Sequence, residues 1–167
     1  MPHFIAVDHV PCTGCKACEV VCSLYHFGEC NPGRSAIHVV RRERDGLVLC
    51  LPLVCQQCEP APCIEACPTE ALSRDGVILA IDEAKCSACG DCAQACPAGC
   101  IFMDSAGMVA ICCDLCGGQP QCVLTCHAQC LTEVDRDEAS QKQDVEYLAS
   151  LLEQEGLWGC VPGKVVR

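Results

Sequence analysis

Cysteines are the residues of this sequence best suited to chemistry: there are 22, and sixteen of them form four close groups. The first and third groups read C-x2-C-x2-C-x3-C, whereas the second and fourth widen the middle gap to four and five residues. In chain order the four quartets are Cys12, Cys15, Cys18 and Cys22; Cys55, Cys58, Cys63 and Cys67; Cys86, Cys89, Cys92 and Cys96; and Cys113, Cys116, Cys122 and Cys126. Such spacing is typical of metal ligands.

A [4Fe-4S] cluster needs one thiolate for each iron, and a tight C-x2-C-x2-C loop supplies three of them. In two-cluster ferredoxins the fourth cysteine of each run ligates the other cluster. The four quartets therefore predict four [4Fe-4S] clusters in two pairs. Zinc is the rival metal, but structural zinc sites usually combine two separated cysteine pairs, which describes this pattern poorly.

The linker lengths indicate which quartets pair. Only 18 residues separate Cys67 from Cys86, enough for one hairpin, so the second and third quartets pair and leave the first and fourth for each other. Pairing of neighbours in chain order is the alternative. The expected ligand sets are Cys55, Cys58, Cys63 with Cys96; Cys86, Cys89, Cys92 with Cys67; Cys12, Cys15, Cys18 with Cys126; and Cys113, Cys116, Cys122 with Cys22.

Other residues near the quartets have plainer interpretations. The remaining cysteines are expected to be mostly small buried hydrophobes; they are Cys30, Cys50, Cys100, Cys112, Cys130 and Cys160. Cys112 competes with Cys113, which we prefer because it preserves the x2 loop. His26 and His127 lie close to cysteines of the first and fourth quartets. We interpret them as ordinary packing and turn residues; the alternatives are a ligand or proton relay for His26 and a hydrogen bond to a cluster, raising its potential, for His127.

Short elements must position these cysteines. The x3 steps predict short helices, and hairpins are expected between the quartets, with turns at Asp45-Gly46, at Asp75-Gly76 and at residues 104–107. An amphipathic helix is predicted over residues 137–155, followed by an apolar tail. The helix and the tail could each cover the body of the protein or dock on a partner, and the sequence does not decide between these roles.

The composition and charge limit the classes of protein to which this chain can belong. The net charge of −11 argues against nucleic acid as a partner. Hydrophobic residues are 51% of the chain, but aromatic ones only 4%, so a core without metal is thin. We expect a cytoplasmic protein, because no export signal is visible and the longest apolar stretch, residues 48–54, is too short to enter a membrane. Nucleotide-binding glycine loops are absent, so the chain is not expected to be an enzyme on its own.

The chain resembles the four-cluster ferredoxin-type subunits of redox enzymes over residues 1–134. Residues 113–122, together with 55–58 and 61–63, carry this resemblance. It implies an α+β fold of two nested, pseudo-symmetric ferredoxin-like modules: an outer one of residues 1–35 and 106–134, a hairpin insertion at 36–54 and an inner one at 55–105. Residues 135–167 then form a C-terminal helix and tail.

Within that family, residues 22–28 and 31–37 resemble the small subunits of tungsten-pterin aldehyde oxidoreductases and benzoyl-CoA reductases. The resemblance implies an electron-transfer role in anaerobic metabolism, beside a large tungsten- or molybdenum-pterin subunit and a flavin-containing or further iron-sulfur subunit. The iron-sulfur subunits of molybdopterin enzymes, formate dehydrogenases, hydrogenases and carbon monoxide dehydrogenase are the alternative. A structural zinc-binding protein is a more distant alternative.

Overall fold

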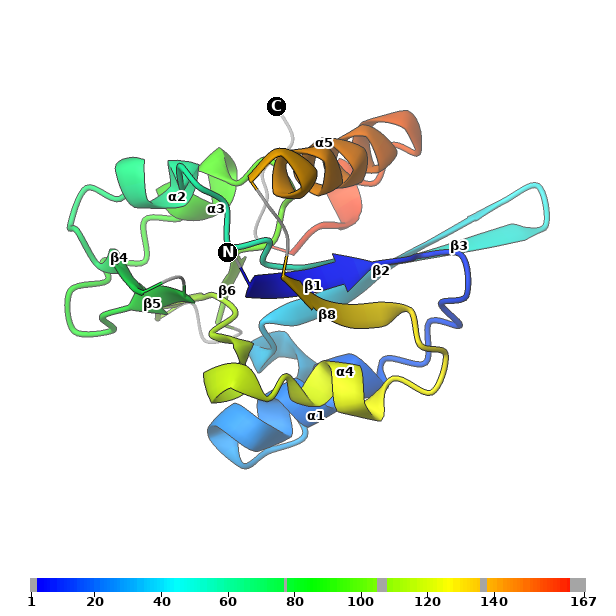
Figure 1. Cartoon of the computed structure of the whole chain (residues 1–167), viewed down its shortest axis with the longest axis horizontal. Coiled ribbons are helices and arrows are strands. Elements are labelled where there is room, and N and C mark those ends of the chain that lie inside the picture. Colours follow the sequence, from blue (N-terminus) through cyan, green and yellow to red (C-terminus); the bar gives the residue numbers. More distant parts are fainter. Residues whose placement is uncertain (1–2, 77, 105–107, 136–137, 163–167) are drawn as a thin grey trace.

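The computed structural model describes residues 3–76, 78–104, 108–135 and 138–162. In these ranges the fold is a set of antiparallel strand pairs and short helices, an α+β architecture (Figure 1). Strand β1 (His3–Val7) pairs with β8 (Leu131–Asp135), so the two ends of the cysteine-rich region meet. This pair was not predicted, because each strand is only five residues long and its partner lies at the other end of the sequence.

The three predicted hairpins are present. Strands β2 (Ile37–Arg44) and β3 (Leu47–Val54) turn at Asp45-Gly46, where both residues have positive φ, as a tight two-residue turn requires. Strands β4 (Leu72–Asp75) and β5 (Ile78–Ile81) form the second hairpin. Strands β6 (Phe102–Met103) and β7 (Ala110–Ile111) form a third, shorter than expected, and part of its predicted turn, 105–107, lies outside the described residues.

Each quartet carries a helix over its x3 step, as predicted. These are α1 (Ala17–Phe27), α2 (Pro62–Glu65), α3 (Asp91–Ala95) and α4 (Gln121–Thr125). Helix α1 packs on α4, and α2 packs on α3. Figure 1 shows α2, α3 and the β4–β5 hairpin together at one side of the molecule, with α1 and α4 together below the β1–β8 pair.

Helix α5 (Glu138–Gln154) covers the body on the side away from α1 and α4 (Figure 1). Its Leu148 and Leu152 are buried in the core. The helix ends with Gly156 at φ 61°, the left-handed residue of a C-terminal cap, and Leu157 N–H donates to the Leu152 carbonyl at 2.8 Å. Covering the body is therefore the role that the structure gives this helix.

The chain after α5 turns back on the body. Leu157 and Val161 are buried in the core on either side of the 3-10 turn η3 (Trp158–Cys160). Gly99 lies directly beneath this turn, and a Cβ there would come within 3.1 Å of the Trp158 ring. Of the two roles left open for the tail, its described part therefore packs on its own chain.

One continuous core joins these elements, and it includes buried cysteines from all four quartets, among them Cys22, Cys55, Cys92 and Cys113. Fully buried Glu19 ties α1 to β2 by accepting a hydrogen bond from Val39 N–H at 2.6 Å. The 3-10 turns η1 (Pro32–Arg34) and η2 (Leu115–Gly118) follow α1 and lead into α4. No helix in the described ranges combines the length and apolar character needed to cross a membrane.

Candidate metal centres

Three small hollows in the molecule are lined by quartet cysteines, and we call them the Cys55 hollow, the Cys86 hollow and the Cys113 hollow. Their quartet cysteines are Cys55, Cys58, Cys63 and Cys96; Cys67, Cys86, Cys89 and Cys92; and Cys22, Cys113, Cys116 and Cys122. The Cys55 hollow is also lined by a fifth cysteine, Cys100, which belongs to no quartet. Each hollow thus combines three cysteines of one quartet with the last cysteine of another.

The four remaining quartet cysteines, Cys12, Cys15, Cys18 and Cys126, line none of these three hollows, and we call them the Cys12 group. Burial and then several neighbours raise the pKa of the Cys12 thiol, and Cys126 is among those neighbours. Burial raises the pKa of Cys18 to about 12, with contributions from Cys12 and Cys15. The first quartet therefore lies beside the last cysteine of the fourth.

The tight loops of the quartets contain residues in the left-handed conformation, which lets three cysteines face one centre. Gln57, Ala88 and Lys16 have φ of 51°, 56° and 62° in the second, third and first quartets. In the fourth quartet Leu115 and Cys116 have φ of 56° and 50°. These turns direct backbone N–H groups inward; for example, Gln57 N–H donates to Cys55 Sγ at 3.4 Å.

The last cysteine of a quartet receives a backbone hydrogen bond. Ala71 N–H donates to Cys67 Sγ at 3.3 Å, and Cys100 N–H donates to Cys96 Sγ at 3.2 Å. Cys22 Sγ accepts from Ala36 N–H at 3.3 Å. Burial opposes ionisation of Cys22, but hydrogen bonds from His26 and Ala36 outweigh it and lower the pKa of this thiol. These donors favour the thiolate form, which is the form that binds metal.

Most other cysteines in the hollows are held as neutral thiols by burial. Burial raises the pKa of Cys55 and Cys113 well above the usual thiol value, and it raises that of Cys122 to about 12. It raises the pKa of Cys58, Cys63 and Cys92 to about 11. Buried sulfurs of this kind become thiolates when a cation replaces the proton. Four soft sulfur donors around one hollow therefore fit a [4Fe-4S] cluster, and they fit zinc by donor type alone.

The hollows are neighbours in a fixed order. The thiols of Cys18 and Cys122 are close enough for one charge to raise the pKa of the other, and the same holds for Cys55 with Cys113 and for Cys92 with Cys63. These electrostatic influences indicate the order Cys12 group, Cys113 hollow, Cys55 hollow and Cys86 hollow.

Gln57 joins the two central hollows. This fully buried side chain donates from Nε2 to the Cys113 carbonyl at 2.7 Å and accepts from Leu79 N–H at 2.7 Å. It belongs to a segment that carries the family resemblance, but nothing in the spacing indicates its structural role.

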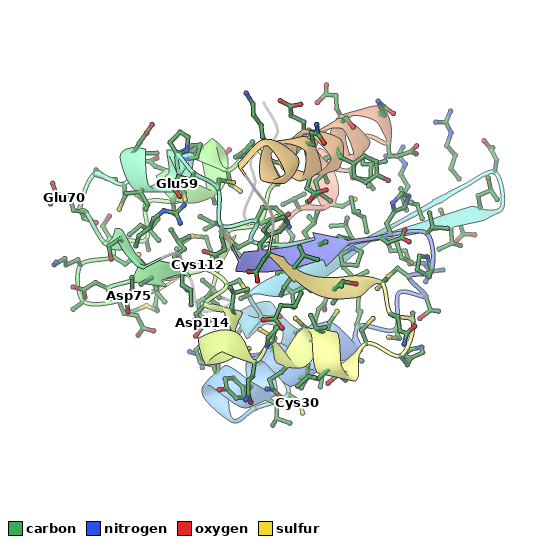
Figure 2. The ribbon with its side chains drawn as sticks, in the orientation of Figure 1. Cys30, Glu59, Glu70, Asp75, Cys112 and Asp114 are labelled. Carbon is green, nitrogen blue, oxygen red and sulfur yellow. The ribbon has the colours of Figure 1, made fainter. Side chains whose placement is uncertain are left out.

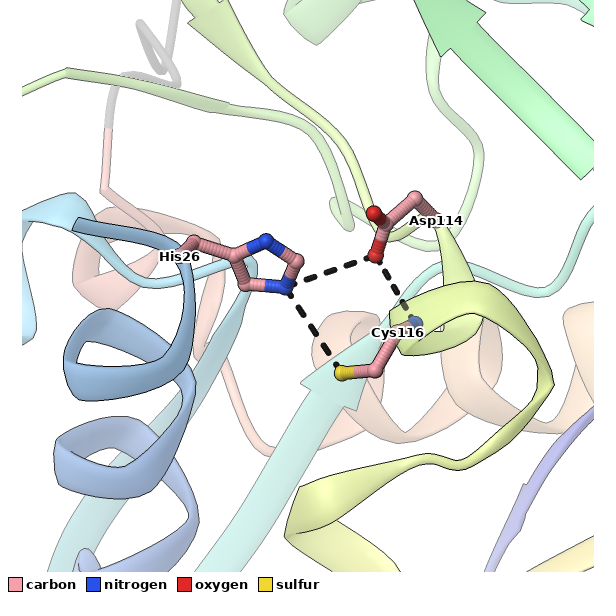
Figure 3. A group of neighbouring side chains, drawn as sticks. All are labelled: His26, Asp114 and Cys116. Atoms are coloured by element: carbon pink, nitrogen blue, oxygen red, sulfur yellow. Dashed lines mark hydrogen bonds and ion pairs between the residues drawn. The ribbon is translucent and has the colours of Figure 1, made fainter. Parts of the chain in front are cut away.

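His26 contacts cysteines, although the sequence favoured a packing role. Its Nε2 lies 3.6 Å from Cys116 Sγ and 3.4 Å from Asp114 Oδ1 (Figure 3). Hydrogen bonds with Cys116 and then Cys22 raise the pKa of this imidazole to about 10 against the opposing effect of burial. The available signal was the four-residue step from Cys22 on one helix, which places both on the same face. His127, in contrast, is exposed.

The additional cysteines differ from one another. Cys50, Cys100 and Cys130 are buried as expected, but Cys30 and Cys160 are exposed, so that expectation was wrong for them. Cys130 Sγ lies 3.3 Å from Cys126 Sγ. Figure 2 shows Cys30 at the outer edge near α1, and Cys112 near the centre of the molecule.

Of the adjacent pair, Cys113 lines its hollow, whereas Cys112 does not. The Cys112 sulfur instead lies 3.9 Å from the Leu79 carbonyl. The geometry therefore favours Cys113 as the ligand.

Comparison with known proteins places this arrangement in context. Residues 47–136 match the family model of the 4Fe-4S dicluster domain. The chain is 42% identical over 127 residues to the aliphatic sulfonate oxidoreductase, polyferredoxin-like subunit, of Pyrococcus furiosus, covering 74% of this chain and 71% of that one. It is 32% identical over 166 residues to the electron transport protein HydN of Escherichia coli K12, covering 84% and 93%.

A solved structure, the active site complex BamBC of benzoyl coenzyme A reductase with benzoyl-CoA, aligns over 89% of both chains at 27% identity with a TM-score of 0.49.

Proposed function

Since the chain belongs to the family of 4Fe-4S dicluster domain proteins, we propose that it carries single electrons through four [4Fe-4S] clusters as a subunit of an oxidoreductase. The observation that carries this proposal is the composition of the hollows: the quartet cysteines of each are three from one quartet and the last from another, with Cys100 as an additional cysteine in the Cys55 hollow. Crossed ligation of this kind is how two-cluster ferredoxins hold their clusters.

Two nested modules follow from the same groupings. The second and third quartets, with α2 packed on α3, form the proposed inner module at residues 55–105. The first and fourth, with α1 packed on α4 and β1 paired with β8, form the outer module at residues 1–35 and 106–134. The β2–β3 hairpin is the insertion at 36–54, and the described residues 138–162 of the C-terminal segment cover the body.

The order of the hollows makes the clusters a linear path. An electron entering at the Cys12 group passes to the Cys113 hollow, the Cys55 hollow and the Cys86 hollow, or travels the reverse way. When bound, each cluster supplies a one-electron redox couple. The polypeptide fixes the separations and sets each potential through hydrogen bonds to sulfur and through burial.

We propose a large tungsten-pterin oxidoreductase subunit as the catalytic partner, of the aldehyde oxidoreductase and benzoyl-CoA reductase type. Residues 22–28 and 31–37 support this choice by their resemblance, and the relative from P. furiosus is itself named as an oxidoreductase subunit. An iron-sulfur subunit of a molybdopterin enzyme is the alternative. Because so many unpaired thiols require a reducing compartment, we place the protein in the cytoplasm.

Anaerobic analysis of iron and acid-labile sulfide tests the cluster proposal. About sixteen irons per chain, four for each cluster, with matching sulfide are expected. Stoichiometric zinc without sulfide would instead identify a structural metal protein and end this proposal. The partner is tested by purifying the native complex and measuring tungsten, molybdenum and nickel in the subunit that accompanies this chain.

A further inference from the structure

The imidazole of His26 is held in place on the last turn of α1, one turn beyond Cys22. The neighbouring Tyr25 ring meets it edge to face, with ring centroids 5.0 Å apart. Phe27 packs at 6.3 Å and is itself covered by the Arg34 guanidinium, 3.9 Å from the ring centroid. These contacts restrict the imidazole to the side of the helix that faces the fourth quartet.

Two acceptors converge on one nitrogen of this ring. The Nε2 atom lies 3.6 Å from Cys116 Sγ and 3.4 Å from Asp114 Oδ1 (Figure 3). A cluster-bound thiolate and a carboxylate both accept hydrogen bonds, so Nε2 must carry the proton. Asp114 is fixed in turn, because its Oδ1 accepts from Cys116 N–H at 2.9 Å.

Cys22 lies one turn before His26 on the same face of α1. Cys22 and Cys116 come from different quartets, but both line the Cys113 hollow, and His26 lines it too. The imidazole therefore lies at the hollow that would hold a single cluster and contacts one of its four sulfurs, that of Cys116.

From these contacts we propose that His26 is a positioning residue that raises the potential of the cluster in the Cys113 hollow, by donating a hydrogen bond from Nε2 to the sulfur of Cys116. This inference rests on the proposed function. Reduction adds negative charge to a cluster and its sulfurs, so a fixed N–H donor stabilises the reduced form more than the oxidised form. The cluster concerned is second in the proposed path, where its potential governs transfer between the outer and inner modules.

The test is a redox titration of the reconstituted full chain, followed by electron paramagnetic resonance. In the variant His26→Phe, one of the four components is expected to become about tenfold harder to reduce, the size of one charge-assisted hydrogen bond. For a one-electron couple this corresponds to a shift of about 59 mV to lower potential. The other three components are expected to keep their wild-type potentials.

Three further variants separate hydrogen bonding from packing. His26→Gln keeps an N–H donor and is expected to recover most of the shift. Tyr25→Phe removes the hydroxyl that lies 3.5 Å from the Cys116 carbonyl, but leaves the sulfur contact, so it should not shift the potential. Asp114→Asn keeps an acceptor oxygen but removes a negative charge beside the cluster, and should move the same component to higher potential.

The outcomes distinguish a failure of the His26 proposal from a failure of the proposed electron-transfer function. A wild-type chain without about sixteen irons contradicts the electron-transfer proposal itself. If the wild type holds its clusters, unchanged potentials in His26→Phe overturn the role of His26 alone. Loss of iron from His26→Phe, or an equal shift in Tyr25→Phe, also overturns it, because His26 would then be holding the structure rather than tuning the cluster.

Discussion

Adjacent cysteines at the start of the fourth quartet have different surroundings, and this difference makes a sharp test of ligand choice. Cys113 lines the hollow that also holds Cys22, Cys116 and Cys122. Cys112 instead points toward the Leu79 carbonyl, and burial raises the pKa of its thiol to about 12. Backbone rearrangement would be needed for Cys112 to replace its neighbour.

We therefore expect Cys113→Ala to lose one cluster, leaving about twelve of sixteen irons per chain. Cys112→Ala is the matched control, since it removes the neighbouring thiol without touching the hollow, and it should retain all sixteen. Iron and sulfide analysis of the two purified variants checks this. The reverse result, iron lost from Cys112→Ala alone, would assign the ligand to Cys112.

The cysteines proposed as metal ligands were easier to group from the sequence than the residues around them. Three of the cysteine sets that the linker argument produced line one hollow each, although Cys100 also lines one of these hollows and their metal ligation stays a prediction. A thiolate loop has a fixed spacing that is visible locally. For His26 the four-residue step from Cys22 was the only local signal, and for Gln57 there was none, because Cys116 and Cys113, which they contact, lie 90 and 56 positions away in the chain.

At the scale of elements, two glycines allow the effect of backbone strain to be told apart from the effect of packing between elements. Gly99 (φ 62°) and Gly28 (φ 69°) both adopt the left-handed conformation. A Cβ on Gly99 would meet Trp158 at 3.1 Å and Val161 at 3.2 Å, whereas one on Gly28 would meet nothing within 4 Å. Gly99 thus lets the C-terminal turn η3 pack directly on the loop after Cys96.

In both alanine variants the left-handed conformation should lower the free energy of unfolding by about 1–2 kcal/mol. In Gly99→Ala the decrease should be larger, because the new Cβ must also push η3 away. We expect its cluster absorbance to disappear at a lower guanidinium concentration than that of Gly28→Ala, and its tail to be cleaved faster by protease. Equal behaviour of the two variants would mean that η3 contributes nothing to stability.

Elements with strong local signals were predicted well, and those defined by distant partners were not. The β2–β3 hairpin has an Asp-Gly turn between apolar branched residues, which specifies it within about twenty residues of sequence. Strand β1 has a short apolar run, and its partner β8 lies more than a hundred residues away. The direction of the C-terminal tail was undecided for a similar reason, since Leu157 and Val161 suit burial on any apolar surface.

At the scale of the whole molecule, the quartet cysteines are part of the hydrophobic core. Buried cysteines from all four quartets pack in the same core as apolar side chains of the strands and of α5. A small domain has only about 5–15 kcal/mol of total stability, and aromatic residues make up only 4% of this chain, so a core without metal is thin. The clusters are therefore expected to hold the core together.

Removal of iron is accordingly expected to unfold the chain. Anaerobic oxidation followed by chelation should abolish the helical circular dichroism signal, including that of α5, which carries no quartet cysteine but packs on the same core. Adding iron and sulfide back under reducing conditions should restore it, and adding zinc alone should not, because one zinc ion is much smaller than the cluster of four irons and four sulfides that each set of four cysteines is proposed to hold. An apoprotein that keeps its helical signal and a cooperative thermal transition would contradict this. The apolar contacts among α5, β1–β8 and the hairpins would then be sufficient for folding, and the cysteines would serve electron transfer alone.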